Sequence, residues 1–176
     1  MGGAVIARYG KSSEMANDNT RQDIECTWDL MKKIRFAMLV TRDGEKLRTR
    51  PVAAYLDRAH NAIYFLTDAR RHKDDEIARS PEVNLSFADA GHQKYVSLTG
   101  TASISNDRAK IRELFSTLAK AWWDSVEDPN IRVLKIIPDD AEFWDSPGTV
   151  ISDVKMATAA VTNTRPDMGE NRKVSL

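Results

Sequence analysis

The chain has 176 residues, and its 26 basic and 26 acidic side chains give a formal net charge of zero. Without a basic surplus, no global field attracts nucleic acid or an anionic membrane surface, so neither is expected as a partner. The single cysteine, Cys26, excludes an internal disulfide, and together with only three histidines it argues against a structural zinc site.

The segment at residues 1–19 lacks apolar periodicity, and we predict a flexible leader there. It has no charged stretch followed by the apolar run of a signal peptide. No part of the chain approaches the roughly 20 consecutive apolar residues that span a bilayer. We therefore expect a cytoplasmic protein with no membrane partner.

The first regular element is a helix predicted over about 21–33, where Thr20 and Asp23 resemble a capping box and apolar residues recur at helical spacing. Two apolar-rich runs follow at 36–41 and 47–56, and a strong hairpin signal, Asp-Gly, lies between them. After a second turn, a third run ends at Thr67. We predict an antiparallel meander of three strands.

A short helix is predicted over 74–79, followed by a strand over 82–88 after a Ser-Pro break. The next strand, about 95–104, alternates apolar and polar side chains. Gly100 interrupts its middle, at a place where a strongly curved sheet needs a bend or bulge. This combination favours a barrel.

The last predicted elements are a helix from Asp107 to about Trp122 and strands over 131–137 and 141–144, with a further strand at 150–154. The three tryptophans on or after helices are expected to pack in the core, namely Trp28, Trp122 and Trp123. Strand-rich blocks without repeated βαβ units indicate one antiparallel barrel with added helices, a mainly β (α+β) domain over residues 20–156. Residues 157–176 are predicted to be a polar tail.

A cluster of basic side chains, Arg70–Lys73, lies where the strand ending at Thr67 meets the short helix. Unpaired backbone N–H groups at a helix start favour anions, so the cluster suits a phosphate. Period-two spacing places Arg48 and Arg50 on one face of a neighbouring strand, where they could meet the cluster. Solvated surface charge, neutralised by nearby acids or protecting a sheet edge, is the alternative for both groups.

Most motifs of known catalytic sites are missing: there is no Gly-x-Gly-x-x-Gly, no Walker loop and no nucleophile elbow. The histidines His60, His72 and His92 fall in separate predicted turns without metal-ligand spacing. No catalytic residue is assigned. Trp144 ends a strand before a Ser-Pro-Gly turn, and there it is expected to contact a ligand or a partner subunit.

Four segments together resemble the FMN-binding split barrels related to pyridoxamine 5'-phosphate oxidase, and within them the general stress protein branch. They are Arg50-Pro51-Val52, Phe65-x-Thr67 with Lys73 six residues later, the strand Tyr95-Val-Ser-Leu-Thr-Gly100, and Glu142-Phe143-Trp144. The resemblance covers roughly residues 24–147. It implies an antiparallel split barrel of about six to seven strands with flanking helices.

The resemblance also implies a set of residues that bind FMN. Arg50 and Lys73 match the phosphate ligands, and Leu66 and Thr67 match residues lining the ribityl chain and ring. The remaining matched positions are Pro51 and Val52 beside Arg50, Arg71 and His72 beside Lys73, Tyr95 where the oxidases have a flavin-contacting Gln, and Trp144 where they have a flavin-contacting Trp. In the family this Trp comes from across a dimer interface, so a homodimer with flavin sites between subunits is expected.

One departure from the family pattern bears on activity. After Trp144 the oxidases continue into an Arg-Leu-His-Asp-Arg signature that holds the pyridoxal phosphate substrate, whereas here the sequence reads Asp145-Ser-Pro-Gly-Thr149. The resemblance thus implies an FMN-binding protein that is a flavin-dependent oxidoreductase on an unidentified small molecule, not a true pyridoxamine phosphate oxidase. Two alternatives stay open: a non-catalytic flavin-binding or redox-sensing module, and an empty barrel with a structural or interaction role.

Overall fold

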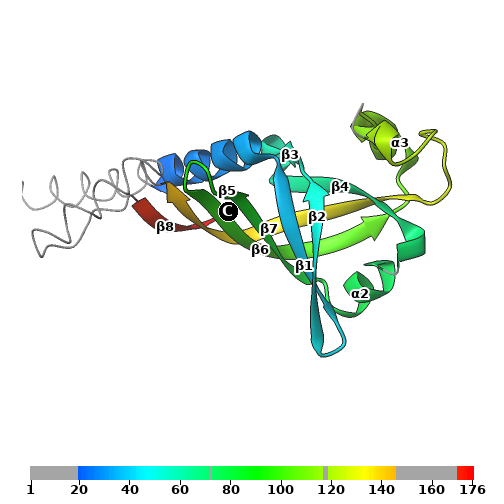
Figure 1. The fold of residues 1–176 in the computed structure, drawn as a ribbon, viewed down its shortest axis with the longest axis horizontal. Helices are drawn as coiled ribbons and strands as arrows, with labels where there is room; N and C mark the ends of the chain where they lie inside the picture. The colour runs from blue at the N-terminus through cyan, green and yellow to red at the C-terminus, as the bar shows by residue number, and fades with distance from the viewer. Residues whose placement is uncertain (1–19, 72, 117–118, 146–169) are drawn as a thin grey trace, which may run out of the picture.

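The structure is a computed structural model that describes residues 20–71, 73–116, 119–145 and 170–176. Residues 20–34 are helical, as expected, and this helix runs along one side of a single curved sheet (Figure 1). The other elements in chain order are β1 Phe36–Asp43, β2 Lys46–Ala53, β3 Tyr55–Asp57, η1 Arg58–His60, β4 Ala62–Asp68, η2 Ala69–Arg71, α2 Lys73–Arg79, β5 Glu82–Asp89, β6 Lys94–Ser105, α3 Arg108–Leu114, η3 Ala119–Ala121, β7 Ile131–Asp145 and β8 Glu170–Ser175. None of the helices in these ranges is long and apolar enough to cross a membrane.

The sheet is curled into a barrel that is split along one seam. Its strand order is β2-β1-β5-β6-β7-β4-β3, with β8 added on β7, and all pairs are antiparallel. The two edge strands, β2 and β3, are separated in the chain by Ala54 alone. The two edges must therefore lie side by side without pairing, and the expected antiparallel split barrel is confirmed.

The strand order corrects one detail of the predicted meander. The run at 47–56 is not one strand, because β2 ends at Ala53 and β3 starts at Tyr55 on the opposite edge. The break is fixed by the helix 20–34, since the Ala54 N–H donates to the Arg35 carbonyl at its end, at 3.0 Å. β4 then pairs with β3 and β7 rather than with β2.

The barrel interior holds the main core. Alternating residues of β1, β4, β5, β6 and β7 point inward, and Trp28 and Met31 cover them from the helix 20–34. The largest fully buried side chains in this core include Leu39, Ile63, Phe65, Leu85, Phe87, Leu98, Leu134 and Phe143. Cys26 packs partly buried at the rim, and burial is the largest cause that raises the pKa of its thiol, which suits a packing role.

Gly100 makes the bend that the sequence predicts. The register between β6 and β7 shifts between Thr99 and Gly100. A Cβ atom built on Gly100 would lie 2.6 Å from the backbone carbonyl oxygen of Ile137, closer than real Cβ contacts allow. Only glycine permits this approach of the two strands, and the bulge increases their local twist.

The second core cluster lies outside the barrel, where α3 covers β4 and the start of β7 through Ile111 and Leu114. The predicted helix to Trp122 is too long: α3 ends at Leu114, and η3 follows at Ala119–Ala121. This break changes the phase of the apolar stripe. Trp123 packs on the second cluster, whereas Trp122 is 74 % exposed and its expected core packing is wrong.

Part of the segment predicted as a polar tail is a strand. β8 pairs with the end of β7, with Val174 opposite Ala141. Val174 is buried in the main core, and Arg172 donates to Asp23 of the helix 20–34 at 3.0 Å. Backbone pairing with β7, the buried Val174 and the Arg172–Asp23 ion pair thus help to hold this polar sequence on the sheet. The expected strand at 150–154 lies outside the described residues.

Candidate functional site

The most constrained group of polar side chains joins Arg50, Thr41 and Glu76. The Arg50 guanidinium donates from Nη1 to Glu76 Oε2 at 2.8 Å and from Nη2 to Glu76 Oε1 at 2.7 Å. Nη1 also donates to Thr41 Oγ1 at 2.8 Å, and the Thr41 hydroxyl donates to Glu76 Oε2 at 2.7 Å. Thr41 is 1 % exposed and Glu76 is 8 % exposed, so this arginine-carboxylate pair is largely removed from water.

The sheet register sets the place of this group. Arg50 lies opposite Leu39, which lies opposite Leu85, and that row continues to Leu98. All three leucines are buried, so Arg50 points to the inner face of the barrel from its edge strand. α2 passes beside the β1–β2 hairpin at this end of the barrel (Figure 1) and supplies Glu76.

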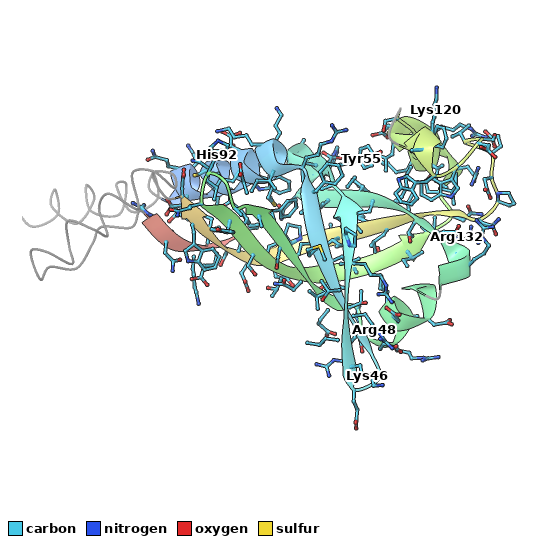
Figure 2. All side chains as sticks on the ribbon, in the orientation of Figure 1. Lys46, Arg48, Tyr55, His92, Lys120 and Arg132 are labelled. Atoms are coloured by element: carbon cyan, nitrogen blue, oxygen red, sulfur yellow. The ribbon has the colours of Figure 1, made fainter. Side chains whose placement is uncertain are left out.

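Arg48 shares the face of Arg50, as predicted, but it does not join the buried group. Its Nε donates to Asp43 at 3.1 Å, and its side chain is 50 % exposed. Figure 2 shows Arg48 and Lys46 on the outer part of the hairpin. For Arg48 the alternative of solvated edge charge is confirmed.

The Glu76 carboxyl has a pKa below its ordinary value of 4.5. Burial raises this pKa, but the hydrogen bonds from Arg50 and Thr41 lower it, and the net shift is downward. Between neutral pH and about 4.5 the charged group stabilises the folded state, and this contribution is lost as the pH falls through the lowered folded-state pKa.

We expect this loss to be visible when the wild type and Glu76→Gln are unfolded in urea over a series of pH values. The difference in unfolding free energy should be largest at neutral pH and should shrink as the pH falls from about 5 to about 3, because Gln does not titrate. A difference that stays constant over this range would show that Glu76 does not titrate as the ion pair requires.

The basic cluster Arg70–Lys73 is described only in part. Arg70 is solvated, as expected, and it pairs with its own neighbour Asp68 through contacts of 2.5 to 3.1 Å. His72 and the side chains of Arg71 and Lys73 lie outside the described residues. The backbone of Lys73 starts α2, three residues before Glu76, so both side chains originate within one turn of the same helix.

The neighbouring predicted residues, Leu66 and Thr67, point to opposite faces of β4. Thr67 is 4 % exposed and shares the inner face with Phe65. Leu66 lies on the outer face and packs on the second core cluster. Val52 also faces inward, opposite Ala37, and packs on the main core. The barrel interior therefore receives Arg50, Val52 and Thr67 from the predicted set.

The outer face receives the other described residues of the set. Tyr95 and Trp144 are direct cross-strand partners on β6 and β7. Tyr95 lies three residues from Leu98 along β6, about 10 Å, and on the other face of the strand. Pro51 is exposed on the same outer face, opposite Met38. Within one chain, Tyr95 and Trp144 therefore do not meet Arg50.

The histidines offer no competing site in the described ranges. His60 and His92 lie in surface turns, as expected, and each contacts the aspartate three residues before it, Asp57 or Asp89, at 2.8 to 2.9 Å. Figure 2 shows His92 at the side of the molecule away from Arg48. Among the described residues, no three potential ligands are grouped for a metal ion.

Sequence reasoning missed Thr41 and Glu76 as members of the site. Thr41 belongs to the strand opposite Arg50 in the predicted hairpin, so its place diagonal to Arg50 follows once the hairpin register is counted. In the sequence, Glu76 is only one of several acids near the basic cluster. Its position three residues after Lys73, within the helix predicted over 74–79, is the available signal for a specific place beside Lys73.

Comparison with known proteins places this geometry in a family. The model of the family described as "Pyridoxamine 5'-phosphate oxidase like" matches residues 22–167. General stress protein 26 of Bacillus subtilis is 31 % identical over 106 residues, which cover 55 % of this chain and 73 % of that protein.

Two solved structures extend the match. A crystal structure of a putative general stress protein 26 from Jannaschia sp. CCS1 has a TM-score of 0.72 at 28 % identity, covering 89 % of this chain and 99 % of that chain. The general stress FMN/FAD binding protein from Xanthomonas citri has a TM-score of 0.61 at 25 % identity, covering 68 % of this chain and 86 % of that chain. This chain belongs to the pyridoxamine 5'-phosphate oxidase-like family, in its general stress protein branch.

Proposed function

We propose that the protein binds FMN, with the cofactor phosphate held at the end of the barrel where Arg50 and α2 meet. The observation that carries this proposal is the fixed guanidinium of Arg50 on the inner face, beside the helix that starts at Lys73. A similar protein from Xanthomonas citri is named as FMN/FAD binding, which supports a flavin. FMN rather than FAD is proposed because the resemblance assigns Arg50 and Lys73 to a terminal phosphate, which FMN has and FAD lacks.

The described residues fit a phosphate at this place. Arg50 is 28 % exposed at its side chain, so it is reachable from solvent although its partner Glu76 is buried. Its Nε–H and one Nη2 hydrogen have no partner among the described side chains, and these two parallel donors suit two phosphate oxygens. Each such charge-assisted bond is worth about 1.5 to 3 kcal/mol.

A second copy of the chain is the proposed partner. The outer face of the sheet carries a patch of Phe36, Met38, Pro51 and Tyr95 with Trp144. Met38 and Pro51 are partners on β1 and β2, and Tyr95 and Trp144 are partners on β6 and β7, with β5 between the two pairs. Phe36 is 55 % exposed and Met38 is 41 % exposed, which is unusual for a strand face left in water. In a homodimer this patch would be buried, and Tyr95 and Trp144 of one subunit would be available to the flavin held by the other.

The dimer proposal predicts the effect of a charge in the patch. Phe36→Glu should convert the dimer to a monomer at micromolar concentration, since a buried carboxylate without a partner opposes association. Size-exclusion chromatography with light scattering measures this, and Trp122→Glu, which alters an exposed aromatic outside the patch, should leave the dimer intact. A monomeric wild type, or a Phe36→Glu variant that stays dimeric, would contradict this interface.

The proposed activity is that of a flavin-dependent oxidoreductase on a small molecule. Flavin, when bound, supplies the redox chemistry, while the protein binds it, orients it and excludes water. Pyridoxamine phosphate is not the proposed substrate, because the signature that holds it in the oxidases is replaced after Trp144 by Asp145-Ser-Pro-Gly-Thr149.

Anaerobic addition of NADH or NADPH to the flavin-loaded protein tests this activity. Bleaching of the flavin absorbance by either nucleotide at a rate of about 1 per second or faster is expected for an oxidoreductase. No reduction by either nucleotide would favour the non-catalytic flavin-binding or redox-sensing module. A colourless protein that also fails to bind added FMN would contradict both and favour an empty barrel.

A further inference from the structure

The guanidinium of Arg50 presents two edges, and the fold uses one of them. Its end-on edge, formed by Nη1 and Nη2, is occupied by the two carboxylate oxygens of Glu76. The second hydrogen of Nη1 is occupied by Thr41. The side edge, formed by Nε–H and the remaining Nη2 hydrogen, is the part left for a ligand among the described contacts. A phosphate that binds Arg50 would therefore contact the edge formed by Nε–H and the remaining Nη2 hydrogen.

Burial and hydrogen bonds hold the Glu76 side chain in place, so an incoming ligand is not expected to displace it. Its side chain is 9 % exposed, it accepts three hydrogen bonds, and its neighbour Ile77 anchors α2 in the main core. Displacement by an incoming phosphate would leave a buried carboxylate without a counter-charge, which is strongly unfavourable. The phosphate is thus expected to add to the Arg50–Glu76 pair rather than to replace Glu76.

We infer that Glu76 is a positioning residue for cofactor binding: it fixes Arg50 so that the Nε side edge faces the FMN phosphate. The inference rests on the proposed function, because it assumes that Arg50 holds that phosphate. An unrestrained arginine side chain samples many rotamers and loses that conformational entropy when it binds a ligand. Here the ion pair with Glu76 has already ordered the Arg50 side chain on folding, so less entropy is lost when the ligand binds. Thr41 supports the same orientation through Nη1.

The carboxylate of Glu76 also repels a phosphate, and this repulsion opposes its positioning effect. The balance of the two effects determines whether a substitution at Glu76 weakens or strengthens FMN binding. While Arg50 is present, two N–H donors neutralise the carboxylate, so the loss of orientation outweighs the relief of repulsion. When Arg50 is absent, the carboxylate is an uncompensated negative charge beside the phosphate position. The same substitution at Glu76 should therefore act in opposite directions in the two backgrounds.

The experiment measures FMN and riboflavin affinity by quenching of flavin fluorescence, with riboflavin as the ligand that lacks the phosphate. Glu76→Gln should weaken FMN binding about tenfold, because an amide offers one acceptor where Arg50 needs two, and riboflavin binding should change less than about twofold. Thr41→Val, which keeps the shape of the site, should weaken FMN binding by about threefold. In an Arg50→Ala background, Glu76→Gln should increase FMN affinity, because it removes an uncompensated negative charge beside the phosphate position.

Glu127→Gln is the matched control, since Glu127 also accepts two bonds from an arginine, Arg112, but on the exposed side of α3. It should alter neither affinity. Unchanged or tighter FMN binding by Glu76→Gln, or an equal loss for FMN and riboflavin, would overturn the positioning role while leaving the proposed function intact. A wild type that does not prefer FMN to riboflavin would overturn the proposed function itself, and this inference with it.

Discussion

Replacing Arg50 with alanine should reduce FMN affinity about hundredfold, because two charge-assisted bonds to the phosphate are lost. The loss should be specific to the phosphate, so riboflavin binding should change by less than about threefold. Titration of the purified variant with each flavin, followed by fluorescence, measures both values. Arg48→Ala is the matched control: this arginine lies two residues away on the same face, but it pairs with Asp43 in solvent, so FMN affinity should stay within about twofold of wild type.

Arg50→Ala should also destabilise the protein without any ligand. The substitution leaves the Glu76 carboxylate buried beside Thr41 with no counter-charge, which costs about 3 kcal/mol of unfolding free energy. The cost should shrink in acid, where the stranded carboxyl binds a proton, and it should shrink in the double variant with Glu76→Gln. An Arg50→Ala protein that unfolds like wild type and binds FMN normally would show that Arg50 is a surface charge.

Gly100→Ala should strongly destabilise the sheet. Its Cβ would lie 2.6 Å from the Ile137 carbonyl oxygen and 2.9 Å from a methyl carbon of Ile136, so β6 and β7 must separate at the bulge. Overpacking against backbone cannot be relieved by a rotamer change, and a loss of about 3 kcal/mol in unfolding free energy is expected.

Urea unfolding measures the Gly100→Ala effect, and Gly91→Ala is its control. At Gly91 the nearest atom to an added Cβ is 3.6 Å away, an ordinary contact, so the change in unfolding free energy should be below about 0.5 kcal/mol. Equal stability of the two variants would mean that β6 and β7 do not approach each other closely at Gly100.

Local signals in the sequence predicted most elements of the fold. The Asp-Gly turn gave the β1–β2 hairpin, alternation gave the two faces of β6, and Gly100 marked the bulge, because each of these depends on neighbouring residues only. The strand order could not be predicted in the same way. A single residue, Ala54, separates strands on opposite edges, and nothing local distinguishes that break from a continuous strand.

The end of α3 and the strand β8 were harder to predict from the sequence. The apolar stripe after Asp107 continues in sequence to Trp122, but α3 stops at Leu114 and the phase of the stripe changes, so Trp122 faces water. β8 has one buried apolar residue, Val174, and its strand exists only because the end of β7 is there to pair with it. Tertiary contacts decided both cases.

In the candidate site, too, local signals could be read from the sequence, whereas contacts between distant segments could not. Arg50 and its neighbour Pro51 could be singled out from one strand, β2, which lies at the edge of the sheet. The Arg50–Glu76 contact joins residues 26 positions apart through the packing of α2 on β1, and no periodicity reports such a contact. The placement of Tyr95 and Trp144 on the other face likewise follows from the register of the whole sheet.

The measurement that tests the proposed phosphate clamp most directly is the titration of the purified wild-type protein with FMN and with riboflavin. We predict saturable binding of one FMN per chain with micromolar or lower Kd, and riboflavin binding at least about hundredfold weaker, as expected when two charge-assisted phosphate contacts are missing. Equal affinity for the two flavins, or no binding of FMN, would contradict a phosphate clamp at Arg50.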